Sequence, residues 1–164
     1  MIVTAVVVPG DNVDTDVLYP GKYINILDPM QARLHLFEGL DPSLRDKLRG
    51  STALFVGENF GSGSSREQPA SAMVASGVRC LIGRSFARIF GRNAVNCGLP
   101  AFVNPTAVDA VLDGAEVDVD LRTGVVRIGE RDFESAPMQS VPKEILAAGG
   151  LVKWVRTRST SPRS

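Results

Sequence analysis

Residues 57–68 read Gly-Glu-Asn-Phe-Gly-Ser-Gly-Ser-Ser-Arg-Glu-Gln, and this stretch decides how the middle of the chain folds. The apolar run before it predicts a buried strand over 53–57, and the run after it predicts a helix over 66–76. Two of its glycines, Gly61 and Gly63, allow backbone N–H groups to turn inward and approach a ligand closely. The N-terminus of the following helix adds unpaired N–H groups and the positive end of a dipole. We therefore expect a backbone anion site at these two glycines.

The side chains of the same stretch allow two interpretations. Arg66 offers a planar guanidinium that suits a carboxylate or a phosphate, and the hydroxyls of Ser64 and Ser65 lie beside it in the sequence. The residues also fit a capping box, with Ser65 as the N-cap and Gln68 at the third helical position. Spacing alone leaves open whether the stretch binds an anion or only starts a helix.

Three better-known motifs do not fit this stretch. A phosphate-binding P-loop needs a lysine before its Ser or Thr, and residues 57–68 contain no lysine. A dinucleotide-binding fingerprint would place glycine where Arg66 stands, and the G-x-S-x-G pattern of a nucleophile elbow is absent. The sequence therefore disfavours nucleotide binding and favours a small carboxylate ligand.

Composition narrows the class of protein further. The 164 residues include 18 Lys and Arg and 18 Asp and Glu, and this balance argues against a nucleic-acid partner. No apolar run approaches the ~20 residues that a membrane helix needs, and no signal peptide is apparent at the N-terminus. We expect Cys80 and Cys97 to be small buried hydrophobes in a reducing compartment, which predicts a cytoplasmic protein.

The chain is poor in the groups that enzymes use for acid–base and metal chemistry. Cys80 and Cys97 are too few to hold an iron–sulfur cluster, and His35 is the only histidine. The acidic loop 9–16 lacks the glycine and the terminal glutamate of the calcium-binding pattern. We therefore expect no metal site on this chain, and we infer that it supplies half of an active site.

The order of apolar runs predicts an α/β domain. Strands and helices alternate from residue 53, which implies parallel strands joined by right-handed crossovers. A hairpin is expected at 116–121 and 125–134, a single domain over 1–155 and a disordered tail over 156–164. The remaining expected elements are strands at 2–8, 78–82 and 99–103, an extended segment at 17–19, and helices at 29–39, 41–49 (a helix or a turn), 85–96 and 142–148.

Four ordered motifs resemble one family. Residues 57–67 look like the signature of the aconitase swivel domain, and most closely that of isopropylmalate dehydratase small subunits. Asp-Asn-Val-Asp-Thr-Asp at 11–16, Pro-Gly-Lys-Tyr-Ile-Asn at 20–25 and the segment 84–100 resemble other motifs of that family. The resemblance runs from about residue 5 to residue 105, with a weaker general likeness beyond.

The resemblance implies a swivel-type β/β/α fold with a mixed, partly parallel sheet flanked by helices. It implies a hydro-lyase that isomerises 2-isopropylmalate in leucine biosynthesis by removing and re-adding water. A large subunit would carry a [4Fe-4S] cluster and most acid–base groups, in a heterodimer or a heterotetramer. Ser64 would act as the base, and Ser65 and Arg66 would bind a carboxylate of the small dicarboxylate substrate.

The chain departs from the family pattern at several positions. Ser62 and Gln68 stand where many members carry Cys and His. The loop expected to recognise the substrate reads Tyr23, Ile24, Asn25 and Ile26, and homoaconitase-like relatives tend to carry Arg in place of Asn25. The absence of an arginine at position 25 disfavours a tricarboxylate substrate. A related alkylmalate or homoaconitate hydro-lyase, or a non-catalytic anion-binding domain of the same fold, remains the alternative.

Overall fold

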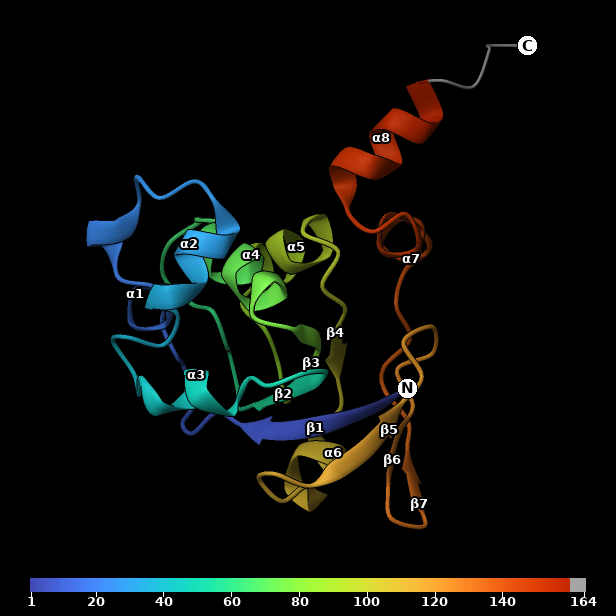
Figure 1. Ribbon diagram of the computed structural model, residues 1–164. Helices are drawn as coiled ribbons and strands as arrows, with labels where there is room; N and C mark the ends of the chain where they lie inside the picture. Colours follow the sequence, from blue (N-terminus) through green and yellow to red (C-terminus); the bar gives the residue numbers. More distant parts are fainter. Residues whose placement is uncertain (160–164) are drawn as a thin grey trace.

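The computed structural model describes residues 1–159 and places a seven-stranded mixed sheet at their centre (Figure 1). The strand order is β4-β3-β2-β1-β5-β6-β7. The first four of these are parallel to one another, and the last three continue the sheet in antiparallel fashion. The predicted α/β fold with a partly parallel sheet is therefore confirmed. The strands are β1 (Ile2–Val7), β2 (Thr52–Val56), β3 (Val78–Gly83), β4 (Ala101–Val103), β5 (Glu116–Val119), β6 (Val126–Ile128) and β7 (Arg131–Phe133).

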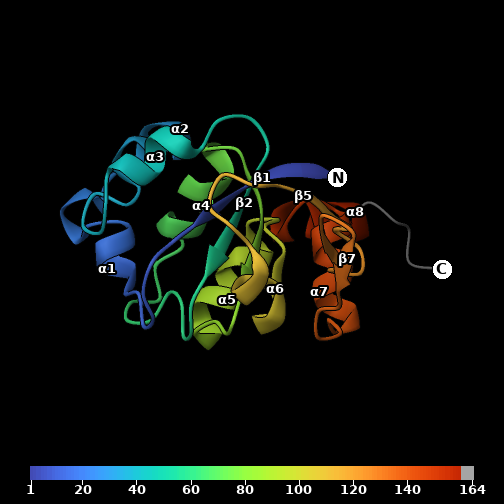
Figure 2. The same cartoon turned by 90° about the horizontal axis from the view of Figure 1, so that it is seen from below.

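The parallel strands are buried on both faces, which explains why they read as continuous apolar runs. Leu54 and Leu81 face the helices α4 (Gln68–Ala75) and α5 (Arg88–Asn96), whereas Phe55 and Ile82 face the other side. There the short helix α6 (Pro105–Ala110), which the sequence analysis did not predict, covers the sheet (Figures 1 and 2). Because alternate residues point to opposite faces, one run of sequence supplies two cores.

The register of the parallel strands aligns their carboxyl ends at one edge of the sheet. Val7 pairs with Phe55, and Phe55 pairs with Ile82. The loops that follow β1, β2 and β3 therefore start side by side. Two isolated parallel bridges join these loops beyond the strands, Asp14 with Ser62 and Phe60 with Phe86.

The segment between β1 and β2 differs from the prediction. Of the expected extended segment 17–19, only Tyr19 is extended, because residues 17 and 18 belong to α1 (Thr15–Leu18). This helix begins after Asp14, whose side chain accepts a hydrogen bond from the Asp16 N–H. The helix expected over 29–39 is a short α2 (Pro29–Ala32) continued by a 3₁₀ turn. It ends because the buried Phe37 takes a positive φ of 63° and donates its N–H to the Leu18 carbonyl. The other elements here are η1 (Gly21–Tyr23), η2 (Arg33–His35) and α3 (Ser43–Lys47).

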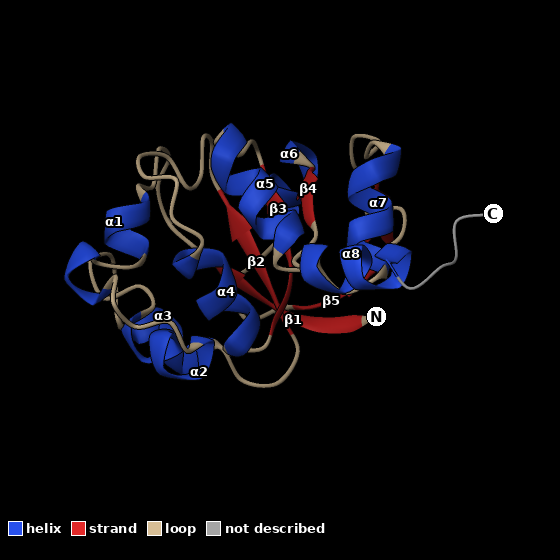
Figure 3. Cartoon of the chain, turned by 90° about the horizontal axis from the view of Figure 1, so that it is seen from above, coloured by secondary structure: helices blue, strands red, loops and turns tan. Residues whose placement is uncertain are grey.

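The C-terminal part differs from the prediction in its hairpin. The strand expected over 125–134 is divided into β6 and β7 by a turn at Gly129, where φ is 60°. The chain then forms α7 (Ser140–Ala147) and α8 (Leu151–Ser159), which lie together on the side of the molecule away from α1 (Figure 3).

The expected disordered tail over 156–164 begins inside α8. Residues 156–159 complete that helix, because Arg158 stacks over Trp154 and binds Glu144 of α7. Residues 160–164 lie outside the described part of the chain. Within residues 1–159, no helix combines the length and apolar character that a membrane crossing requires.

Candidate functional site

The loop 57–67 is held between the loop that follows β1 and the segment that follows β3. On one side, the Thr15 N–H donates to the Ser62 carbonyl at 2.8 Å, and the Gly61 N–H donates to the Val13 carbonyl at 2.9 Å. On the other side, the Ala87 N–H donates to the Phe60 carbonyl at 2.9 Å. Backbone bonds on both flanks fix the path of this loop, so the side chains that follow it are placed with little freedom.

Two glycines are required by this close packing. Gly61 has a φ of 81°, and a Cβ there would lie 2.1 Å from Cγ of Phe90. Gly63 has a φ of 92°, and a Cβ there would lie 2.4 Å from a carboxylate oxygen of Asp14. Both the backbone conformation and the available space exclude a side chain at these positions.

The predicted backbone anion site at these glycines is corrected in one respect. The Gly61 N–H already donates to Val13, and it therefore has no capacity left for a ligand. The Gly63 N–H has no hydrogen-bond partner within residues 1–159, and Gly63 is exposed. An anion-binding role for Gly63 stays a prediction.

Ser64 and Arg66 form a directly bonded pair. Nε of Arg66 donates to Oγ of Ser64 at 2.9 Å, and the backbone N–H of Arg66 donates to the same oxygen at 3.3 Å. The Ser64 N–H in turn donates to Oγ1 of Thr15 at 3.0 Å. Two N–H groups therefore converge on the hydroxyl oxygen of Ser64, as they would on a negatively charged oxygen.

The capping-box interpretation is wrong. Helix α4 begins at Gln68, two residues later than predicted, and its N-cap is Glu67, which makes no side-chain capping bond. The Gln68 side chain instead donates to the Ile24 carbonyl at 3.2 Å. Ser65 is exposed, and its carbonyl accepts a hydrogen bond from Asn93 of α5 at 2.9 Å.

The guanidinium of Arg66 bridges the two loops. A terminal nitrogen of Arg66 forms an ion pair with Asp16. The Arg66 side chain is 16% exposed, whereas that of Asp16 is 64% exposed. A Cβ on Gly21 would lie 3.0 Å from Nη1 of Arg66, so the 3₁₀ turn η1 approaches the guanidinium closely. Arg66 is thus largely enclosed by protein, and its partner Asp16 is the more exposed of the two.

Of the four predicted recognition-loop residues, Tyr23 is anchored most firmly. Its hydroxyl donates to Glu38 at 2.7 Å, and its ring stacks on His35 with centroids 3.7 Å apart. His35 and Lys22 also contact Glu38 at 3.0 Å and 3.1 Å. The Tyr23 hydroxyl, His35 and Lys22 together lower the pKa of Glu38 to about 2.

The other three residues of the recognition loop differ in how far they are buried. Ile26 is partly buried and packs against the core. Ile24, which is 47% exposed, and Asn25 face solvent. The loop is therefore fixed at Tyr23 and Ile26, while Ile24 and Asn25 remain open to a ligand.

Comparisons with known proteins find relatives that align with almost the whole chain. Residues 44–103 match the model of the aconitase C-terminal domain. The chain is 44% identical over 151 residues to a 3-isopropylmalate dehydratase small subunit of Caldanaerobacter subterraneus subsp. tengcongensis, covering 91% of this chain and 94% of the relative. It is 45% identical to 3-isopropylmalate dehydratase small subunit 1 of Methanopyrus kandleri, covering 90% and 88%.

The chain belongs to the family of 3-isopropylmalate dehydratase small subunits. A solved structure of a 3-isopropylmalate dehydratase from Methanocaldococcus jannaschii matches it with a TM-score of 0.88 and 38% sequence identity. That match covers 97% of this chain and 96% of the solved one. The resemblance to isopropylmalate dehydratase small subunits that the four motifs indicated is therefore confirmed, and it extends well beyond residue 105.

Three residues beside Ser64 and Arg66 had no role in the sequence analysis. Asp16 pairs with the guanidinium, Thr15 accepts the Ser64 N–H, and Asn93 holds the carbonyls of Ser65 and Arg66. Thr15 and Asp16 lie in the 11–16 motif and Asn93 in the 84–100 motif, both of which resemble the family. The co-occurrence of these motifs with 57–67 was a signal that the three segments meet.

Proposed function

We propose that this chain is the small subunit of a hydro-lyase that converts 2-isopropylmalate into 3-isopropylmalate by dehydration and rehydration. Family membership over nine-tenths of the chain supports this choice of reaction. The observation that carries the catalytic part of the proposal is the convergence of two Arg66 N–H groups on Oγ of Ser64.

The reaction removes a proton from one carbon and a hydroxyl group from its neighbour, and a carbon–carbon double bond forms between them. A serine hydroxyl is a weak base, so Ser64 must first release its own proton to solvent, and the resulting alkoxide must be stabilised until it accepts the substrate proton. Nε of Arg66 at 2.9 Å and the backbone N–H of Arg66 at 3.3 Å provide that stabilisation. Ser64 then carries the proton and returns it to the other carbon when water is added back.

Arg66 also binds the substrate in this proposal. Its terminal nitrogen is paired with Asp16, and Asp16 is the more exposed partner. A substrate carboxylate that enters from solvent replaces Asp16 on the guanidinium, while Nε keeps its bond to Ser64. The exposed hydroxyl of Ser65 and the exposed N–H of Gly63 lie on the same stretch and add donors for that carboxylate.

Substrate choice is assigned to the recognition loop. Ile24 and Asn25 face solvent, and neither carries a positive charge. A branched alkyl group can contact Ile24, whereas an additional carboxylate would be left without a partner, which is costly when it is buried. The loop therefore favours an alkylmalate over homoaconitate.

The proposal requires a partner, because this chain does not fit the cluster that its family implies. Within residues 1–159, no group of three or more His, Cys, Asp or Glu side chains could hold a metal ion. Burial raises the pKa of both the Cys80 and the Cys97 thiols to about 12, and two cysteines are fewer than the four thiolates that such a cluster usually takes. We assign the [4Fe-4S] cluster and the remaining acid–base groups to a large subunit, in a cytoplasm where both cysteines stay reduced.

Reconstitution tests this proposal. The purified chain is mixed with its large subunit, and interconversion of the two isopropylmalates is followed against each subunit alone. We expect turnover only in the mixture, and size-exclusion chromatography then gives the stoichiometry. Turnover by this chain alone would contradict the proposal that it supplies only half of the active site. Activity of the mixture on homoaconitate alone would show that the proposed substrate is wrong.

A further inference from the structure

A cavity of about 680 Å³ lies at the opposite edge of the sheet from Ser64 and Arg66. It is lined by the last turn of α4, the start of β3 and the segment just before β4. These parts lie at the amino ends of the parallel strands, whereas the candidate site follows the carboxyl ends of the same strands. The C-terminal helices α7 and α8 form its other wall. Its volume falls within the ~300–1,000 Å³ typical of small-molecule sites.

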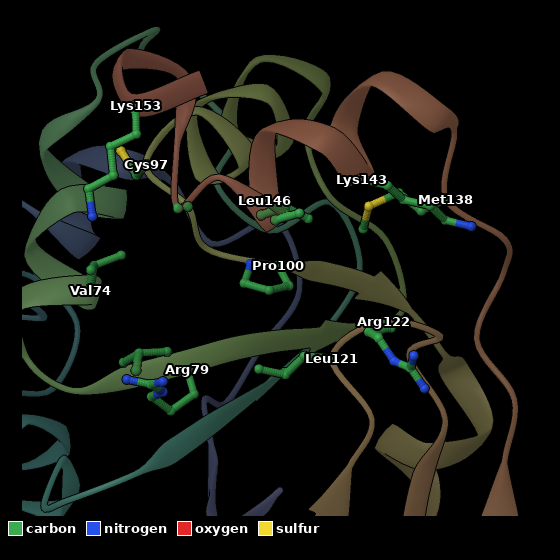
Figure 4. A pocket seen from close by; sticks show the side chains of 14 residues that line it. Val74, Arg79, Cys97, Pro100, Leu121, Arg122, Met138, Lys143, Leu146 and Lys153 are labelled. Atoms are coloured by element: carbon green, nitrogen blue, oxygen red, sulfur yellow. The ribbon is translucent and has the colours of Figure 1, made fainter. Parts of the chain in front are cut away.

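The walls of this cavity combine an apolar middle with a positively charged rim. Pro100, Leu121 and Leu146 lie in its middle (Figure 4). Arg79 and Lys153 lie at the end near Val74, and Arg122 and Lys143 lie at the other end (Figure 4). No Asp or Glu is among the lining residues within the described part of the chain.

The cations near Val74 differ from several other surface cations of this protein. Lys22, Lys47, Arg84 and Arg127 each pair with a carboxylate of the chain. Neither Arg79 nor Lys153 forms an ion pair or a side-chain hydrogen bond within residues 1–159. Nζ of Lys153 instead lies over the glycine turn between α7 and α8, 3.4 Å from the position of a Cβ on Gly149. Two unpaired cations beside an apolar cavity are complementary to an anionic head group on an apolar body.

We propose that this cavity is a second ligand site, which binds a small amphiphilic organic anion. The head group, a carboxylate or a sulfonate, pairs with Arg79 and Lys153, and the apolar body lies against Pro100, Leu121 and Leu146. The site is independent of the proposed dehydratase chemistry, because it shares no residue with the Ser64–Arg66 pair.

The probe for this site is 8-anilinonaphthalene-1-sulfonate, whose fluorescence rises in apolar surroundings. The full chain, alone and assembled with its large subunit, is titrated with the probe, and the bound probe is then displaced with decanoate or with inorganic phosphate. We expect one saturable site per small subunit, displaced by decanoate and not by phosphate. Phosphate that displaces the probe as well as decanoate does would show that charge alone is recognised, and the proposal would fail.

Two variants locate the site. Arg79→Gln/Lys153→Gln removes the head-group contacts, and we expect at least about tenfold weaker binding of the probe, because a charged hydrogen bond commonly contributes that much. Ala147→Trp fills the cavity from an exposed position without changing charge and should also abolish binding.

The matched control removes two positive charges elsewhere. Lys47 and Arg131 lie outside the cavity, and Lys47→Gln/Arg131→Gln should leave the affinity for the probe unchanged. Circular dichroism confirms that each variant is folded. Equal affinity in the wild type and in a folded Arg79→Gln/Lys153→Gln variant would overturn the assignment, as would loss of affinity in the control.

Discussion

The parallel half of the sheet, β1 to β4, ends in loops that are tied to one another, whereas the turn at Gly114 that leads into the antiparallel half is open to solvent. Gly61 and Gly114 illustrate the contrast, because both have a φ of 81°. A Cβ on Gly61 would meet the ring of Phe90 at 2.1 Å, and a Cβ on Gly114 would meet nothing within 4 Å.

Glycine is therefore required at these two positions for different reasons. In the turn before β5, only the backbone conformation requires it. In the loop after β2, the conformation and the space both require it, because three segments distant in the sequence meet there. The loop after β2 therefore carries its side chains, Ser64 and Arg66, on a backbone that packing has fixed, as preorganised chemistry requires.

The largest expected effect comes from exchanging these glycines for alanine. Gly114→Ala adds only the left-handed backbone cost, about 1–2 kcal/mol of unfolding free energy. Gly61→Ala adds to that cost a clash with Phe90, and overpacking typically costs a further 1–3 kcal/mol, roughly. Urea unfolding of both variants measures the difference. Equal destabilisation would show that the loop after β2 is not tightly packed.

The second largest effect is expected when an arginine is exchanged for lysine in the parallel half of the sheet and in the antiparallel half. Arg66→Lys removes the planar fork that contacts Ser64 and Asp16 together, and a lost charged hydrogen bond of about 1.5–3 kcal/mol predicts a kcat/KM roughly 10- to 150-fold lower. Arg127→Lys disturbs the exposed Arg127–Asp132 pair between β6 and β7, which should cost at most ~1 kcal/mol of stability and no turnover. Steady-state kinetics of the assembled enzyme decide between these outcomes. If the two variants had the same kinetics, Arg66 would be a surface ion pair only.

A smaller effect is expected at the solvent-facing part of the recognition loop. Asn25→Arg supplies a charge that can pair with an additional carboxylate, and it should move the kcat/KM ratio toward homoaconitate by about tenfold. Asn25→Gln keeps the position neutral and should leave the ratio unchanged. The ratio for the two substrates is measured in the assembled enzyme. A ratio that does not move in the arginine variant would show that another segment chooses the substrate.

The smallest expected effect is the pH dependence of stability caused by Glu38, the residue that anchors Tyr23 of the same loop. Glu38 has its pKa lowered from 4.5 to about 2, first by the Tyr23 hydroxyl and then by His35. Since the folded form resists protonation, this contribution to stability is complete above pH 4.5 and is lost as the pH falls toward 2. Glu38→Gln should therefore be less stable than the wild type at pH 7, and the difference should be much smaller at pH 2.5.

Urea unfolding midpoints at these two pH values measure the effect. Glu130, an exposed carboxylate in the turn between β6 and β7, provides the control, and Glu130→Gln should match the wild type at both pH values. A constant difference between Glu38→Gln and the wild type across this range would mean that the carboxylate of Glu38 does not anchor Tyr23.

The sheet was largely predictable, because strands buried on both faces must be apolar along their length. The runs at 2–8, 53–57, 78–82 and 99–103 correspond to β1–β4, and their alternation with helices predicts the parallel order. Short elements were missed or misplaced, as at α1 and α6, because they depend on single capping side chains such as Asp14 and Asn104.

The contacts of the candidate site were not predictable from the sequence, and the roles of its residues stay predictions. Ser64 and Arg66 were identified from the motif, whereas the pairing of Arg66 with Asp16 joins residues 50 positions apart and depends on how β1 and β2 align. The capping box failed for a related reason. Ser65 and Gln68 have the right spacing, but Gln68 uses its side chain to hold Ile24, a contact that no local pattern contains.

The central claim is that Ser64 acts chemically and not as a structural residue. Its most direct test combines turnover and thermal unfolding of one variant, Ser64→Ala, assembled with the large subunit. We predict that turnover is abolished while the melting temperature falls by less than the shift expected from a lost cap, which costs about 1 kcal/mol of unfolding free energy. Ser51→Ala, at an exposed serine on the other edge of the sheet, should change neither quantity. Retained turnover with a lowered melting temperature in Ser64→Ala would contradict the claim and make Ser64 a structural residue.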